Sequence, residues 1–260
     1  MAWDIKRVTD PSSLFQEFLS ADVPNAGFRG QSDNSWKLQP SLNRLAHLTD
    51  EPALIKRELD IAVEFKTRSR PFLDYLEQAF LGHPNDPMST SAVAVLQHYG
   101  APTRLLDWSY SPFVALFFAV VECPQKDGAV WSFSNTELTA AADKNWNVHG
   151  IGREIDNTVN LNAHAFKVGA ADWFCSTHSP IPFQRMSRQH GFFTIAGRLN
   201  VDHGDKISHL VTSQPVRWDI PSSLEPVFLR QLKLMGLDST SLGYMGADSV
   251  GREISSRFKL

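Results

Sequence analysis

The stretch Gln97–Val121, QHYGAPTRLLDWSYSPFVALFFAVV, decides the fold of this chain. Its first half is dense in polar, ionisable and aromatic residues, and its second half is the most apolar segment of the sequence. Ser111-Pro112 predicts a helix start, because a hydroxyl group can cap free backbone N–H groups and proline suits the first helical position. The residues that follow, 113–121, have no polar face, so we expect this helix to be buried on all sides.

A second helix is predicted just upstream, over Ser91–Tyr99, where Gly100 and then Pro102 end it. The segment between the two helices, 101–110, reads as a loop. Its polar and aromatic side chains are Thr103, Arg104, Asp107, Trp108 and Ser109. A loop this polar between two core helices is either an internal strut or the floor of a site.

Composition bounds the class of protein. The chain has 260 residues, of which 42% are hydrophobic, enough for one largish domain with a sizeable core. The net charge of −3 gives no global reason to expect a nucleic-acid coat or an anionic membrane as partner, although a local basic patch stays open. No apolar window reaches the roughly 20 residues of a membrane span, and no apolar leader follows Met1. Two widely spaced cysteines, Cys123 and Cys175, suit free thiols, so we expect a cytoplasmic protein.

The remaining elements are read from periodicity and turn residues. The longest helical pattern, 51–81, is a helical insert that Pro71 breaks or kinks, and its interleaved charges indicate a solvated face. Residues 147–168 are polar and weakly patterned, which suggests a lid or insertion. The other predicted helices are 14–21 and 224–235, and the predicted strands are 3–8, 28–31, 128–133, 192–195, 207–212 and 216–220.

These elements predict the fold class. The connections between the late strands are too short for crossovers, so those strands pair antiparallel. We therefore expect an α+β fold with a small, split, mostly antiparallel sheet flanked by helices.

Three sequence blocks carry a family resemblance. The central stretch, the block Phe28-Arg29-Gly30-Gln31 and the block 185–194, which contains Gln189-His-Gly-Phe-Phe, occur in this order. Together they resemble the FRG domain, a bacterial and phage-associated family named for a Phe-Arg-Gly motif. The resemblance spans roughly 25–254 and implies a single FRG-type domain over 1–260. The family name records a sequence motif and not a reaction.

The Phe-Arg-Gly block has two interpretations. Gly30 lets the backbone come close to a ligand or turn sharply, and Arg29 at a strand end can grip a phosphate or carboxylate. Alternatively, Arg29 is a buried arginine paired with Asp107 or another acid. The resemblance favours the functional interpretation, and it adds Gln31 to the residues expected at the ligand.

The central block also leaves alternatives open. Arg104 and Asp107 are three residues apart, and we favour an internal ion pair that braces the loop over a direct role of Arg104 at a ligand. Trp108 is a stacking platform or core. His98 ends its helix, where it either satisfies terminal carbonyl groups or acts in catalysis. Ser111 faces a ligand or caps the following helix.

A second, weaker resemblance points to a reaction. Many ADP-ribosyltransferases place an Arg-Gly or His-Gly strand end first, then a Ser-x-Ser step into a helix, and a catalytic glutamate on a later strand. Arg29-Gly30 is similar to the first element, and Ser109-Tyr-Ser111 to the second. At the third element this chain has Gln189. A carboxylate there would stabilise the oxocarbenium-like charge that develops as nicotinamide leaves. Either Gln189 suffices, or another acid such as Asp107 serves, or the chain binds a nucleotide without turnover.

Three hypotheses follow from these resemblances and alternatives. The first is an ADP-ribosyltransferase-like enzyme using NAD, in a toxin or phage-defence role, with a protein or nucleic-acid acceptor and an antitoxin or other protein as a candidate partner. The second is a non-catalytic module that binds or senses a nucleotide or nucleic acid. The third is a metal-independent nuclease or hydrolase using His98 with Asp107; no cluster of Asp, Glu and His has metal-ligand spacing.

The candidate residues divide by role. The expected catalytic residues are Arg29, His98, Asp107 and Gln189. The expected nucleotide-binding residues are Arg29, Gly30, Gln31, Thr103, Arg104, Trp108, Ser109 and Ser111.

Overall fold

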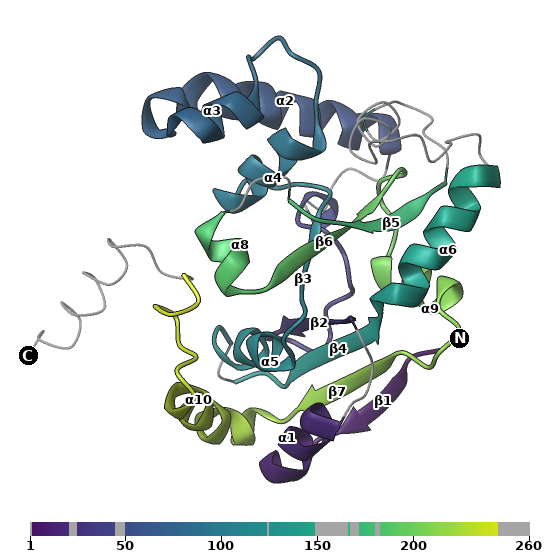
Figure 1. Ribbon diagram of the computed structural model, residues 1–260, viewed down its shortest axis with the longest axis vertical. Coiled ribbons are helices and arrows are strands. Elements are labelled where there is room, and N and C mark those ends of the chain that lie inside the picture. Colours follow the sequence, from purple (N-terminus) through teal and green to yellow (C-terminus); the bar gives the residue numbers. More distant parts are fainter. Residues whose placement is uncertain are drawn as a thin grey trace, which may run out of the picture.

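In the computed structural model of this chain, the residues described are 2–20, 25–44, 50–123, 125–148, 166, 172–179 and 183–243. The predicted lid or insertion, 147–168, lies almost entirely outside the described residues. Within them the chain forms one mixed sheet with helices around it (Figure 1).

The sheet has seven strands in the order β1-β7-β4-β2-β3-β6-β5. Every neighbouring pair is antiparallel except β1–β7, which is parallel. The bounds are β1 Asp4–Arg7, β2 Ala26–Gln31, β3 Leu106–Ser109, β4 Gly128–Ser134, β5 Phe174–Thr177, β6 Gly191–Ala196 and β7 Val216–Ile220. The expected α+β class with a mostly antiparallel sheet is confirmed.

The sheet is nearly divided between β2 and β3. These two central strands share a single residue pair, Phe28 with Ser109, whereas β2 pairs with β4 along all six of its residues. Beyond Phe28, β2 and β3 part. This seam is the split that the sequence predicts, and the functional candidates of both strands lie along it.

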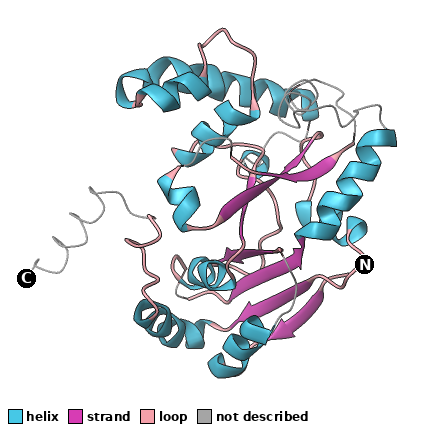
Figure 2. Ribbon diagram, viewed as in Figure 1, coloured by secondary structure: helices cyan, strands magenta, loops and turns pink. Residues whose placement is uncertain are grey.

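The helices cover both faces of the sheet (Figure 2). Their bounds are α1 Pro11–Ser20, α2 Glu51–Ser69, α3 Tyr75–Leu81, α4 Thr90–His98, α5 Pro112–Val120, α6 Asn135–Val148, α8 Gln184–Arg188, α9 His203–Leu210 and α10 Glu225–Leu234, with short 3₁₀ turns at Leu42–Arg44, Arg70–Phe72 and Ser222–Leu224. The predicted break of the long insert is confirmed, because the 3₁₀ turn around Pro71 separates α2 from α3. No helix in the described ranges combines the length and apolarity needed to cross a membrane.

Three hydrophobic clusters fill the space between sheet and helices. Helices α1, α5 and α10 pack on one face of β2, β4 and β7. Helices α6 and α9 cover the opposite face. Helix α4 and the insert α2–α3 pack against β5 and β6, at the top of the view in Figure 1. Helix α5 therefore lies over the strands on one side of β3 in the strand order, and helix α4 lies over those on the other side.

The buried helix α5 sits unusually close to the sheet. Ser111 caps it, since its Oγ accepts a hydrogen bond from the Val114 N–H at 3.4 Å. A Cβ atom at Gly30 would lie 1.9 Å from the carbonyl oxygen of Ala115, and one at Gly128 would lie 2.1 Å from that of Ala119. Gly30 is therefore required by the packing of α5 on β2. The close approach expected at this glycine is to a helix backbone.

Two expectations for local structure are corrected. The segment 101–110 is not all loop, because β3 occupies Leu106–Ser109 with Leu106 and Trp108 buried. The predicted strand 207–212 belongs to helix α9, which Asp202 caps by accepting from the Gly204 N–H at 2.8 Å. Its buried positions are spaced four apart, as helix packing requires. The short elements β5 and α8 were not predicted.

Candidate functional site

A cleft of about 220 Å³ opens where β2 and β3 part, beside α5. Seven of the residues proposed from the sequence line it: Arg29, Gly30, Gln31, Asp107, Trp108, Ser109 and Gln189. The other lining residues are Phe28, Ser32, Trp36, Arg44, Val114, Ala115, Phe118, Glu122 and Arg185. Residues more than 150 positions apart in the chain thus meet at one hollow.

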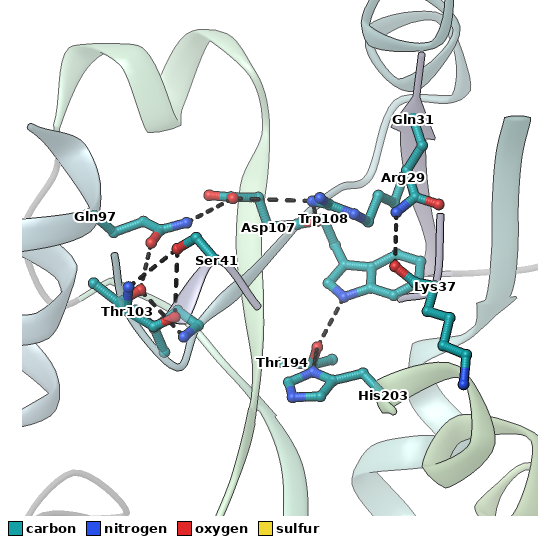
Figure 3. Close-up of polar contacts among 11 residues, drawn as sticks. Arg29, Gln31, Lys37, Ser41, Gln97, Thr103, Asp107, Trp108, Thr194 and His203 are labelled. Atoms are coloured by element: carbon teal, nitrogen blue, oxygen red, sulfur yellow. Dashed lines mark hydrogen bonds and ion pairs between the residues drawn. The ribbon is translucent and has the colours of Figure 1, made fainter. Parts of the chain in front are cut away.

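Arg29 lies across the seam between the two strands. Its Nη1 donates to the backbone carbonyl of Asp107 at 2.7 Å, and the same nitrogen is 3.9 Å from the Asp107 carboxylate (Figure 3). The side chain replaces ladder hydrogen bonds that the parted strands do not make. Burial lowers the pKa of Arg29 to about 10, Asp107 opposes this shift, and Arg44 adds to it. Arg29 is therefore still a cation at neutral pH.

Asp107 is the carboxylate at the mouth of the cleft. Its side chain is 53% exposed, and its Oδ2 accepts a hydrogen bond from Gln97 Nε2 at 2.7 Å. Gln97 in turn accepts from the hydroxyl of Thr103, whose own N–H donates to Ser41 Oγ at 3.1 Å (Figure 3). Thr103 does not line the cleft; it stands behind Gln97 and orients it.

Ser109 and Gln189 join β3 to the turn that precedes β6. The Ser109 hydroxyl donates to the backbone carbonyl of Gln189 at 2.7 Å and accepts from the Ser111 N–H at 2.9 Å. A hydroxyl has one donor and two acceptor positions, so Ser109 can accept one more hydrogen bond. The amide of Gln189 donates to the carbonyl of Leu242 at 2.9 Å, which fixes its orientation at the edge of the cleft.

Trp108 forms the back wall of the cleft. It is buried, and its Nε1 donates to Thr194 Oγ1 at 2.9 Å, which lies 2.9 Å from His203 Nδ1 (Figure 3). Burial lowers the pKa of His203 to about 3, and the charge of Arg29 adds to the shift. His203 is therefore neutral at physiological pH, and Trp108 is a core residue whose edge faces the cleft.

Gln31 is held at both ends of its amide. Its Oε1 accepts from Trp131 Nε1 at 2.7 Å, and its Nε2 donates to the backbone carbonyl of Lys37 at 3.1 Å (Figure 3). Its side chain is almost fully buried. Gln31 thus ties β2 to the segment that follows it.

Arg104 faces away from the cleft. Its Nε donates to both carboxylate oxygens of Glu58, at 2.9 and 3.0 Å, and the side chains are 1% and 2% exposed. The interpretation of Arg104 and Asp107 as an ion pair is wrong, because Arg104 pairs with Glu58 on α2 and Asp107 lies beside Arg29. Successive side chains of an extended segment point to opposite sides. Arg104 and Asp107 are an odd number of residues apart, so their side chains lie in different surroundings.

His98 and Asp107 line a second, smaller hollow of about 60 Å³, together with Arg185 and Gln189. The His98 ring stacks on Phe183 with centroids 4.2 Å apart. Burial lowers the pKa of His98, and the charge of Arg185 lowers it further. Among the described residues no hydrogen bond joins His98 to Asp107.

The cleft residues without a role predicted from the sequence include Trp36, Arg44, Glu122 and Arg185. Glu122 comes seven residues after Ala115 and four after Phe118, which is the spacing of one helix face. This spacing could have predicted that Glu122 lies beside them. Arg29, Arg44 and Arg185 against Asp107 and Glu122 leave one net positive charge on the lining, although the whole chain carries −3. In the described ranges, no three His, Cys, Asp or Glu side chains gather as metal ligands.

Comparison with known proteins bears on the family. Residues 24–128 match the family model described as the FRG domain. This range holds the Phe28-Arg29-Gly30 block and the central stretch, whereas the block 185–194 lies beyond it. No curated protein and no solved structure matches the chain significantly.

Proposed function

We propose that this chain, which carries an FRG domain in residues 24–128, is an ADP-ribosyltransferase-like enzyme with NAD as its substrate. One observation carries the proposal. The strand arginine, the Ser-x-Ser step and the later strand that the resemblance names are far apart in the sequence, yet Arg29, Ser109 and Gln189 line one cleft. The arrangement of the three elements, and not any one motif, supports the reaction.

Arg29 suits the diphosphate of NAD. A guanidinium group presents a planar set of donors that matches phosphate oxygens, and the positive lining of the cleft favours an anionic ligand. Its Nε is buried and makes no hydrogen bond with any described residue. A ligand that accepts from the guanidinium edge would add to the contacts that Arg29 already makes with Asp107.

Asp107 takes the role of the missing glutamate in this proposal. When the bond between ribose C1′ and the nicotinamide nitrogen breaks, its electron pair leaves with nicotinamide and positive charge develops on the ribose. A carboxylate fixed beside the ribose stabilises that charge without reorganising. Gln97 and Arg29 fix the Asp107 carboxylate. The acceptor then forms the new bond to C1′ and gives up a proton, while Ser109 and Gln189 hold neutral groups of the substrate.

The proposal is tested by NAD titration with nicotinamide release measured in parallel. Asp107→Asn keeps the shape and removes the charge; we expect NAD still to bind and release to fall about a hundredfold or more. Arg29→Lys keeps the charge and removes the fork, and we expect weaker NAD binding. Arg68→Lys is the matched control, because Arg68 is 76% exposed on α2 and, among the described residues, pairs only with Glu64 on the same helix.

Two outcomes contradict the enzyme. If the wild type binds NAD and releases no nicotinamide, the chain is a nucleotide-sensing module. The neutral Gln189, held by Leu242, is the observation that favours this alternative. If the wild type does not bind NAD, the proposal fails, and cleavage of nucleic acid lost in His98→Ala would favour the hydrolase instead. The setting as a toxin or phage-defence effector rests on the family resemblance alone.

A further inference from the structure

An exposed tryptophan stands at one end of the cleft on a rigid loop. Trp36 is 37% exposed and lines the cleft. The backbone N–H of Trp36 donates to the backbone carbonyl of Asp33 at 3.2 Å, and the Asp33 carboxylate accepts from the Ser35 backbone N–H at 2.9 Å. The Asn34 N–H donates to the carbonyl of Asp127 at 2.7 Å. An indole fixed in this way at a cleft mouth is a preorganised surface for a flat ligand group.

Gln31 holds the far side of the same loop. Its Nε2 donates to the carbonyl of Lys37, the residue directly after Trp36, while Trp131 on β4 fixes its other end. Ser32 anchors the beginning of the loop, since its hydroxyl donates to the carbonyl of Phe118 on α5 at 2.8 Å. Gln31 is thus a positioning residue for Trp36.

Two charged residues line the same cleft as Trp36. They are Arg44 and Glu122; Glu122 comes two residues after the end of α5, whereas Ser109 precedes the helix. The two ends of the nine-residue helix α5 are about 13 Å apart at 1.5 Å per residue. The cleft lining therefore runs from Ser109, before α5, to Glu122, after it, and hydrogen bonds from Ser32 to Phe118 and from Asn34 to Asp127 hold the Trp36 loop near the end of α5 that leads to Glu122.

We propose that the end formed by Trp36, Arg44 and Glu122 binds the adenosine half of the dinucleotide. Adenine stacks on the Trp36 indole, the Glu122 carboxylate accepts hydrogen bonds from the ribose hydroxyls, and Arg44 pairs with the adjoining phosphate. The inference rests on the proposed function. It adds that the enzyme prefers NAD to its 2′-phosphorylated form, because a phosphate beside Glu122 meets a like charge.

The stacking contact is tested with the two halves of the substrate. We expect Trp36→Leu to weaken ADP-ribose binding about tenfold or more, as loss of an aromatic platform for a base does, and to leave the affinity for nicotinamide mononucleotide unchanged. Trp36→Phe restores most of the loss, which a mere folding defect would not allow. Tyr75→Leu on α3, where the tyrosine is 86% exposed and outside the cleft, is the control.

The role of Glu122 is tested by competition between NAD and its 2′-phosphorylated form. Glu122→Gln removes the repelling charge at constant shape, so we expect the preference for NAD over the 2′-phosphorylated form to fall about tenfold or more. Gln31→Leu, which releases the loop, lowers ADP-ribose affinity in the same direction as Trp36→Leu. An unchanged ratio of the two dinucleotides overturns the assignment of Glu122.

The two proposals fail separately. If the wild type binds NAD and releases nicotinamide while Trp36→Leu binds ADP-ribose as well as the wild type does, the adenosine subsite is wrong and the enzyme stands. If the wild type binds neither NAD nor ADP-ribose, both proposals fall. If a single-stranded oligonucleotide binds and ADP-ribose does not compete with it, the indole serves a nucleic acid and the inference is overturned.

Discussion

Two arginine–carboxylate pairs of this protein have opposite surroundings. Arg104 and Glu58 are 1% and 2% exposed, and two hydrogen bonds of 2.9 and 3.0 Å from one arginine nitrogen close the pair. Arg29 and Asp107 are 15% and 53% exposed, with 3.9 Å between nitrogen and oxygen. The two arginines come from two of the three sequence blocks that carry the family resemblance, so the blocks alone do not tell the pairs apart.

The difference shows how burial divides structure from function. The closed pair is almost fully buried and joins α2 to the residues just before β3. The open pair leaves hydrogen-bonding capacity on both sides at the mouth of a cleft. We therefore propose that Arg104 serves stability and Arg29 serves ligand binding, and the predictions below test that division.

The largest effect is expected from breaking the closed pair. Arg104→Met leaves the Glu58 carboxylate buried without its partner, which costs about 3–5 kcal/mol of unfolding free energy. Urea unfolding followed by circular dichroism measures it. The double variant Arg104→Met with Glu58→Leu should recover most of the loss, because no charge is then left in the core. A loss below about 1 kcal/mol in the single variant would place this pair with ordinary surface pairs.

An intermediate loss of stability is expected at acidic pH. It comes from His203, which lies behind Trp108 at the back of the cleft. The folded-state pKa of His203, about 3, is below its ordinary value of 6.5, so between these values the unfolded chain binds a proton that the folded chain does not. Stability therefore falls as the pH drops below 6.5, by about 2 kcal/mol at pH 5.

Urea unfolding at pH 7 and pH 5 checks this prediction for the wild type and His203→Gln. The variant removes the titrating ring, so it should lose less stability between the two pH values than the wild type does. His83→Gln, at an exposed position just after the helical insert, is the control and should keep the wild-type pH dependence. Equal pH dependence in wild type and His203→Gln would mean that water reaches the ring behind Trp108.

The smallest effect on stability is expected at the open pair itself. Asp107→Asn should cost less than about 1 kcal/mol, because the carboxylate is more than half exposed and the ion-pair distance is long. The same variant carries the large loss of nicotinamide release proposed above. The division between the two pairs fails if Asp107→Asn destabilises the protein as much as Arg104→Met does.

The sequence predicted the parts of this fold that depend on local chemistry. The Ser111-Pro112 helix start, the buried helix after it, the break at Pro71 and the strand at 216–220 all follow from capping, ring geometry and periodicity. Helix α9 was missed because its buried residues are few and its histidines and aspartates hid the period of four. The four-residue strand β3 was missed because an alternation over only four residues is too short to stand out from a polar loop.

The candidate site was predicted only in part, because local sequence patterns do not show which residues meet in the folded chain. Gly30 and Gln31 were expected at the ligand, yet Gly30 makes room for α5 and Gln31 supports the Trp36 loop. Motif letters do not say which of several backbones or side chains a residue touches. Arg44 and Trp36 carried no sequence signal, because their role depends on the loop after β2 folding back over the cleft.

The single residue pair between β2 and β3 has a mechanical consequence. The sheet consists of two plates, β1-β7-β4-β2 and β3-β6-β5, joined along one edge by Phe28 and Ser109. Few backbone hydrogen bonds resist a change in the angle between the plates. A ligand held by Arg29 on one plate and by Gln189 beside the other would act as a strap across this hinge. Binding of a ligand in the cleft would then restrict the change in angle between the two plates of the sheet.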